Sequence, residues 1–309
     1  MKSGLLSDEP PSAAATEAEA VVAQSVCKTF RVRAAHGRAH HEFQAVHDVS
    51  FSVKRGQSLG IVGESGSGKT TIARMLSGLE RATSGTIQVA GRERSTPVRN
   101  ARERRRRGRE LQIVFQDPYT SLDPRQPVGR CLDEVLRLHT ALDGERRRAR
   151  IAELLDHVGL DERHARSLPR ELSGGQRQRA AIARALAAEP IAIVLDEAVS
   201  ALDVSIQAQV LNLLNRLRAD TGVAYVFISH NLAVVRQVTD EALVLQRGKV
   251  VERGPTEEVL DRPQHKYTRR LLASIPVPGW DPHELTGRQR RDGRAPASSP
   301  DGPAPAAEI

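Results

Sequence analysis

The chain has 309 residues, which is long enough for one large domain or two smaller ones. Its formal charge of +8 favours anionic partners such as nucleotides, nucleic acids or lipid headgroups, without choosing among them. Two cysteines far apart exclude a disulfide framework and suit a reducing compartment, and no apolar run reaches the roughly 18–20 residues of a spanning helix. The acidic N-terminus does not resemble a secretory signal, so at a membrane other chains would have to supply the spans.

Residues 1–20 are predicted to form a disordered tail, followed by two strands at Val21 to Phe30 and Phe43 to Val53. We expect these strands to pair antiparallel around a polar hairpin loop, Arg31 to His41. The loop histidines suggest a metal site, but no carboxylate or cysteine completes an ordered one, which favours a plain loop. Phe30 lies before the apolar strand at Ser58 to Val62, where its ring would either stack on adenine or pack in the core.

A glycine-rich loop follows an apolar strand, Ser58 to Val62, and precedes a helical pattern, Thr70 to Leu79. Its sequence, Gly-Glu-Ser-Gly-Ser-Gly-Lys-Thr, fits the G-x-x-x-x-G-K-[ST] pattern of a phosphate-binding P-loop. The free N–H groups at the helix start favour an anion, and the glycines let the backbone approach its oxygens. Lys69 supplies a charge for the terminal phosphates, and the Thr70 hydroxyl is placed to ligate Mg²⁺. The expected nucleotide-binding residues here are Gly63, Ser65, Gly66, Gly68, Lys69, Thr70 and Thr71.

An arginine-rich stretch, Arg92 to Arg109, follows a short predicted strand at Thr86 to Val89. It includes consecutive arginines at 104–107. Such a run is either a patch for nucleic acid or lipid, or a solvated helix face or loop. No aromatic side chain interleaves it to stack on bases, which favours the solvated face.

A buried strand, Leu111 to Phe115, leads into Gln116 and then into a mostly helical block at about 118–175. Because Gln116 directly follows a strand, its amide is a candidate ligand for Mg²⁺ or water, or a sensor of the nucleotide. Helices are expected around Cys131–His139, Glu145–Val158 and Asp161–Ser167.

A second potential anion site, Ser173-Gly174-Gly175-Gln176, opens a further helix that is expected to run to Ala188. Ser173 can cap this helix, and the glycines permit close backbone approach. The alternative is an ordinary capped helix start. One chain would then carry two helix N-termini suited to bind phosphate, but only one Asp-Glu pair. If two chains met head to tail, each could complete the site of the other and both helix N-termini would be used.

Asp196 and Glu197 end a wholly apolar strand, Ile191 to Leu195, which is typical of a central parallel strand. Ligands of parallel sheets bind outside that edge, so Asp196 is placed to hold Mg²⁺ and Glu197 to polarise a water as general base. The alternative is an exposed acidic turn. His230 follows another buried strand, Ala224 to Ile228, where it can bond the γ-phosphate and orient Glu197, although a lone histidine is more often structural.

Strands that alternate with helices around a phosphate loop predict an α/β fold. We expect a mostly parallel P-loop core of the RecA-like type, with an antiparallel β subdomain and a helical subdomain. An amphipathic helix at Ile206 to Leu217, a hairpin about Arg247-Gly248 and short helices at Glu257–Leu260 and Tyr267–Ser274 complete the folded part. From 276 to 309, the composition predicts a flexible tail.

Together these motifs resemble the ATP-binding cassette of ABC transporters over about residues 21–275. The matching segments are the P-loop (Gly63–Thr71), the Q-loop (Gln116), the signature (Leu172–Arg179), Walker B (Ile191–Glu197), the D-loop (Ser200–Asp203) and the H-loop (His230). The resemblance implies ATP and Mg²⁺ as cofactors, with Thr70, Gln116 and Asp196 at the metal. It also implies that two cassettes form a dimer that binds two ATPs. Each ATP would lie between the P-loop of one chain and the signature of the other, with Asp203 at the nucleotide site.

Three segments are similar to those of ATPases from bacterial dipeptide, oligopeptide and nickel importers: Asp117–Arg125, Asp196–Ser205 and the C-terminal element at about 255–275. Lys266 replaces the proline of that element. The resemblance implies a peripheral ATP-hydrolysing subunit on the cytoplasmic face of a membrane, powering import of peptides or a related small solute.

The implied partners are a second cassette, two permease subunits and an extracytoplasmic solute-binding protein, and no nucleic acid is expected. The alternatives are a soluble ABC ATPase acting on nucleic acid or ribosomes, and a nucleotide-gated interaction module with little turnover. The single cassette and the importer-type C-terminal element argue against the first, and intact Glu197 and His230 argue against the second.

Overall fold

The computed structural model describes residues 19–33, 40–117 and 121–274. The tails expected at 1–20 and 276–309 lie outside these residues, apart from 19 and 20. The chain divides into a large unit, Met1–Leu272, and a short one, Ala273–Ile309, and the elements below belong to the large unit except for the last residue of the final helix.

A six-stranded sheet forms the centre of this unit, in the order β10-β9-β3-β8-β7-β6. Its strands are β3 (Ser58–Val62), β6 (Leu111–Val114), β7 (Ala192–Asp196), β8 (Ala224–Ser229), β9 (Glu241–Gln246) and β10 (Lys249–Pro255). All neighbours pair in parallel except β10 with β9. Every residue of β3, β7 and β8 is buried, which explains their nearly continuous apolar sequences.

A second sheet is antiparallel and has the order β2-β1-β4-β5. Its strands are β1 (Glu19–Arg33), β2 (His40–Lys54), β4 (Ser84–Val89) and β5 (Arg92–Glu93). The loop expected over residues 31–41 is therefore shorter than predicted, because the β1–β2 pairing continues to Arg33 opposite His40. Only residues 34–39 of that loop lie outside the described part of the chain.

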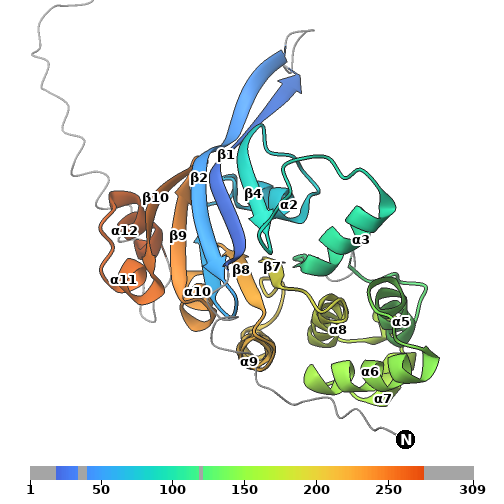
Figure 1. The fold of residues 1–309 in the computed structure, drawn as a ribbon. Helices are drawn as coiled ribbons and strands as arrows, with labels where there is room; N and C mark the ends of the chain where they lie inside the picture. The colour runs from blue at the N-terminus through green and yellow to red at the C-terminus, as the bar shows by residue number, and fades with distance from the viewer. Residues whose placement is uncertain (1–18, 34–39, 118–120, 275–309) are drawn as a thin grey trace, which may run out of the picture. The chain divides into compact units, whose positions relative to one another are not determined.

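Four helices cluster after β6, as Figure 1 shows in green and yellow: α5 (Val128–His139), α6 (Gly144–His157), α7 (Glu162–Arg166) and α8 (Gly174–Leu186). The buried side chains of α5 recur every three or four residues, which gives the helix one apolar face. A short 3₁₀ turn, Pro169–Glu171, joins α7 to α8. The helices predicted in this block are confirmed, with ends that differ by a few residues.

The other helices are α2 (Lys69–Ser77), α3 (Ala101–Glu110), α9 (Val204–Thr221), α10 (Leu232–Val238), α11 (Thr256–Asp261) and α12 (Lys266–Ala273). Helix α10 was not predicted. Its seven residues are too few to show a clear helical period, and its valines favour strands when taken alone. In the described part of the chain, no helix is both long and apolar enough to cross a membrane.

The predicted α/β fold, with a mostly parallel core, an antiparallel sheet and a cluster of helices, is confirmed. Its consequence for function is geometric. Because β3, β8, β7 and β6 are neighbours and run in parallel, their carboxyl ends lie along one edge of the sheet.

Candidate nucleotide site

Four of the predicted positions follow directly from those strand ends. Gly63 comes immediately after β3, Asp196 is the last residue of β7, and His230 comes immediately after β8. Gln116 is two residues beyond β6. Segments far apart in the sequence therefore meet at the sheet edge where ligands of parallel α/β folds bind.

The P-loop between β3 and α2 is held at its glycines. A Cβ at Gly63 would lie 2.2 Å from the carbonyl oxygen of Leu245, and one at Gly68 would lie 2.5 Å from that of Ala45. Both glycines have positive φ, 151° and 106°, so a side chain there would also strain the backbone. No described atom lies within 4 Å of a Cβ built on Gly66, which leaves the loop open at that point.

The Lys69 side chain is buried against the loop that it belongs to. Its ammonium donates hydrogen bonds to the carbonyl oxygens of Gly63 and Glu64, both at 2.8 Å. Burial lowers the pKa of Lys69, while the negative charges of Glu197 and Asp196 oppose that shift. The cation therefore lies among carboxylates and loop carbonyls, close to where terminal phosphates bind in P-loops.

Asp196 and Thr70 offer oxygen atoms suited to a cation. The Asp196 carboxylate is buried, and its Oδ1 has no hydrogen-bond partner among the described residues. Burial, reinforced by the charge of Glu197, raises the pKa of Asp196, and the Thr70 hydroxyl bonded to it acts in the opposite direction. A buried, unpartnered carboxylate oxygen beside a hydroxyl fits Mg²⁺, which prefers hard oxygen ligands.

Glu197 and His230 form a hydrogen-bonded pair, with 3.1 Å between Oε1 and Nδ1. The backbone of Glu197 is in the left-handed region, with φ of 50°, which is strained for a residue with a side chain. Its N–H donates to the Ile228 carbonyl at 2.9 Å, and its own carbonyl accepts from the Ser200 hydroxyl at 2.9 Å. These contacts hold the carboxylate beside Asp196 in a fixed direction, half-buried and accessible to water.

The second predicted anion site lies at the start of α8. Ser173 and Gln176 form a reciprocal capping box, in which each side chain accepts a hydrogen bond from the other backbone N–H, at 3.3 and 2.9 Å. A Cβ on Gly175 would come within 2.5 Å of Ile206 in α9, whereas Gly174 is exposed. Within the described chain, no hydrogen bond or ion pair joins this segment to the P-loop of the same molecule.

The remaining predicted residues lie in varied surroundings. Phe30 is half-buried in the core of the antiparallel sheet, and the Lys28 ammonium lies 4.7 Å from its ring centroid. Gln116 and Ser65 are exposed, and Thr71 is half-buried in α2. Asp203 caps α9 by accepting from the Ile206 N–H at 2.9 Å, a bond that lowers its pKa.

Comparison with known proteins identifies the family. A family model described as ABC transporter matches residues 46–200, about half of the chain. The chain is 45% identical over 262 residues to a Di/tripeptide transport ATP-binding protein of Pseudomonas aeruginosa, a match that covers 85% of this chain and 80% of that protein. The chain belongs to the ABC transporter family. It is an ATP-binding ATPase of that family, as the motifs predicted.

Two further matches concern the C-terminal part and a longer relative. A model described as the C-terminal region of oligopeptide/dipeptide transporters matches residues 251–301. The Glutathione import ATP-binding protein of Escherichia coli is 49% identical over 240 residues, which is 78% of this ABC ATPase but 38% of that relative. The chain therefore spans well under half of the length of that second protein.

Solved structures support the same fold. An ATP-binding cassette solved as a dimer in a post-hydrolysis state, bound to ADP and Pi, has a TM-score of 0.65 and 29% identity. That match covers 76% of this chain and 98% of the other. A component of an ABC transporter complex from Clostridium perfringens has a TM-score of 0.68 over 89% of this chain, and at 22% identity it supports the fold alone.

Sequence reasoning missed a contact between the C-terminal region of this ABC ATPase and its P-loop. The Tyr267 hydroxyl of α12 accepts a hydrogen bond, 3.1 Å long, from the backbone N–H of Glu64 in the P-loop. The ring is buried, and burial raises the pKa of the phenol. More than 200 positions separate the two residues, so no local pattern could reveal the contact. It joins the region matched by the oligopeptide/dipeptide model directly to the phosphate loop.

We predict that Tyr267→Phe weakens nucleotide binding, because the Glu64 N–H loses its acceptor and the loop is held less firmly. One such bond contributes about 0.5–1.5 kcal/mol, so KM for ATP should rise roughly 2- to 10-fold, with a smaller change in kcat. The measurement is steady-state ATP hydrolysis by purified protein. Tyr225→Phe is the matched control, since its buried hydroxyl bonds the Leu214 carbonyl at 3.1 Å away from the loop. Equal KM values in the two variants would contradict the prediction.

Proposed function

We propose that this chain is the ATP-hydrolysing subunit of an importer of peptides or a related small solute. The observation that carries the proposal is the joint match to an ABC transporter model and to the oligopeptide/dipeptide C-terminal region within one chain. The relative of 45% identity is named for di- and tripeptide transport, which favours peptides as the solute class.

The P-loop and Walker B residues would hold ATP and Mg²⁺. The loop N–H groups and Lys69 would bind the β- and γ-phosphates, which replace the loop carbonyls as partners of the ammonium. Thr70, Asp196 and the nearby Gln116 would ligate Mg²⁺, and the unpartnered Oδ1 of Asp196 supports that role. When bound, the metal ion neutralises charge on the phosphate oxygens during transfer. The proposed phosphate-binding site also includes Ser65, Gly66, Gly68 and Thr71.

Glu197 would act as general base toward the attacking water. Its carboxylate is fixed by the strained backbone turn and by His230, so it need not reorganise during the reaction. His230 would orient this carboxylate and contact the γ-phosphate. Phe30, which is partly buried, would stack on the adenine, and the alternative role for its ring is core packing.

A second cassette would complete each site. The start of α8, Ser173-Gly174-Gly175-Gln176, is exposed at Ser173 and Gly174, and no described hydrogen bond or ion pair joins it to the P-loop of its own chain. In a head-to-tail dimer they would face the nucleotide of the partner, with Asp203 alongside, because α8 and α9 pack together near those residues. This arrangement uses both anion sites of the chain.

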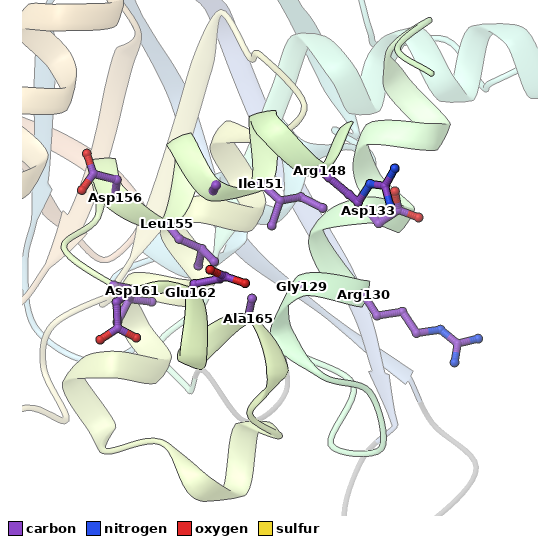
Figure 2. A pocket seen from close by; sticks show the side chains of 12 residues that line it. Gly129, Arg130, Asp133, Arg148, Ile151, Leu155, Asp156, Asp161, Glu162 and Ala165 are labelled. Atoms are coloured by element: carbon purple, nitrogen blue, oxygen red, sulfur yellow. The ribbon is translucent and has the colours of Figure 1, made fainter. Parts of the chain in front are cut away.

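Permease subunits would dock on the helical cluster. A hollow of about 740 Å³ opens between α5, α6 and α7. Figure 2 shows Ile151, Leu155 and Ala165 on the helices that line it, with the Glu162 carboxylate among them. A lining of apolar and charged side chains suits a short amphipathic segment. The chain would then sit peripherally on the cytoplasmic face of the membrane, with a solute-binding protein on the other side.

The proposal is tested by purifying this chain in mild detergent from membranes of its own cells and identifying the chains that accompany it. We expect two multi-span permeases, a second cassette and an extracytoplasmic peptide-binding protein. Recovery with ribosomes or DNA, and without a membrane-spanning partner, would overturn the importer assignment and leave the ATPase standing.

We predict that Glu197→Gln leaves ATP binding close to normal and lowers the hydrolysis rate at least about 100-fold, the usual contribution of a positioned general base. The amide keeps the shape of the side chain but cannot accept the proton. Nucleotide affinity and single-turnover hydrolysis measure the two effects. Glu241→Gln, the same change in a remote ion pair with Arg253, should alter neither. Near-normal turnover in Glu197→Gln would exclude Glu197 as the base.

We predict that Ser173→Ala abolishes hydrolysis while each chain still binds ATP, because Ser173 would act on the nucleotide of the partner chain. Asp143→Ala is the control for helix destabilisation, since Asp143 caps α6 with a comparable 2.8 Å bond to the Arg146 N–H. Mixing Ser173→Ala with Lys69→Ala chains should restore about one active site per mixed dimer. Loss of ATP binding in Ser173→Ala would contradict the shared site.

A further inference from the structure

The strongest concentration of charge outside the nucleotide site lies on α3 and the segment before it. Residues 92–110 contain nine arginines and three glutamates, a net charge of +6 out of +8 for the whole chain. Helix α3 is capped by Asn100, whose side chain accepts from the Glu103 N–H at 2.8 Å. The stretch predicted to be a solvated helix face or loop is thus a helix in its second half, which carries six of the nine arginines.

Part of this charge stabilises the fold. The buried Glu110 carboxylate pairs with Arg92 at 2.5 Å and with Arg94 at 2.9 Å, and the Arg107 guanidinium pairs with Glu103 at 2.6 Å. The pKa of Arg94 is lowered to about 10 by burial, and the negative charge of Glu110 opposes this shift. Arg109 pairs with Glu189 at 2.7 Å, so the α3 arginines without an ion pair to a described residue are Arg102, Arg104 and Arg105.

A hollow of about 680 Å³ beside α3 is lined by five arginines. Arg102 and Arg105 form no ion pair with any described residue. Arg92 and Arg106 share the Glu110 carboxylate and Arg109 pairs with Glu189, but about half of each of these three side chains is exposed. His139, at the end of α5, also lines the hollow, and its buried Nδ1 has no hydrogen-bond partner among the described residues. Five arginines and one histidine thus line one concave surface, and two of the arginines, Arg102 and Arg105, have no ion pair with a described residue.

We propose that this hollow binds the phosphate groups of anionic membrane lipids. Guanidinium forks bind phosphate oxygens in pairs, and they lose less on leaving water than ammonium groups do. A polybasic surface close to an anionic leaflet gains about a factor of five in affinity for each arginine. The site would add a lipid contact to the attachment that permease subunits provide.

Membrane lipid is favoured over nucleic acid by the lining of the hollow. Apart from His139, the lining side chains are Arg, Asn and Glu, so no large aromatic ring is available to stack on a base. The helix has ten residues, about 15 Å, which is short for tracking a nucleic-acid strand. The inference rests on the proposed function in one respect, which is that the chain is held near a membrane.

The test is flotation of the purified full-length chain with phosphatidylcholine vesicles that either contain or lack phosphatidylglycerol. Arg102→Gln/Arg105→Gln removes two charges without breaking a described ion pair. Arg163→Gln/Arg166→Gln on α7 is the control for the loss of two exposed positive charges, because both arginines are more than four-fifths exposed and their only described ion pairs are local, with Asp161 and Glu162. We expect the α3 variant to bind phosphatidylglycerol vesicles about 10- to 30-fold more weakly than the wild type, and the control to change little.

A conservative variant, ATP hydrolysis and two competition experiments test the lipid assignment further. Arg102→Lys/Arg105→Lys should keep most of the binding, and both α3 variants should hydrolyse ATP like the wild type, which separates this inference from the proposed function. Equal binding to neutral vesicles, or equal loss in the α7 control, would overturn it. Competition by inorganic phosphate at low millimolar concentration would point to a free anion site, and selective loss of oligonucleotide binding in the α3 variant would point to nucleic acid. Either result would also overturn the lipid assignment.

Discussion

The architecture of the site depends on how tightly the P-loop backbone is held. Gly63 and Gly68 lie so close to the carbonyl oxygens of Leu245 and Ala45 that any side chain would collide. The Ser67 carbonyl accepts a hydrogen bond from Gly248 at 2.9 Å, so the β9–β10 turn also supports the loop. The loop is thus shaped by the parallel sheet, the antiparallel sheet and the edge hairpin together. A loop held in this way offers its N–H groups to an anion with little further loss of entropy.

The parallel sheet then places the charged groups around that loop. Lys69 is buried within reach of Asp196 and Glu197, and each carboxylate favours the charged form of the lysine, whereas the charge of Glu197 raises the pKa of Asp196. The resulting site has two acids and one cation before any ligand is present. A polyphosphate alone would add to the negative charge, which explains why the unpartnered oxygen of Asp196 suits a divalent cation that enters with it.

Much of this arrangement could be predicted from the sequence, because it is encoded in short segments. The P-loop, the apolar strand before Asp196 and the family membership were all predicted correctly. The roles of the individual site residues, Phe30 most of all, remain predictions. The left-handed turn at Glu197 and the bond from Tyr267 to Glu64 were not foreseen, since both depend on contacts between distant segments. The ion pairs of Glu110 were missed for the same reason, because a run of arginines does not indicate which of them a buried carboxylate will hold.

The Tyr267 contact joins the C-terminal region to the phosphate loop of the ATPase core. Helix α12 lies in the segment matched by the oligopeptide/dipeptide model. The Tyr267 hydroxyl of this helix accepts a hydrogen bond from the backbone of the loop that would bind the phosphates. Arg247 and Arg270 line a small hollow against the outer side of the same loop. A displacement of α12 would therefore remove an acceptor from the P-loop backbone and move positive charge near the phosphates. Through this contact, any partner that moved the C-terminal region would alter nucleotide affinity, because binding at coupled sites is reciprocal.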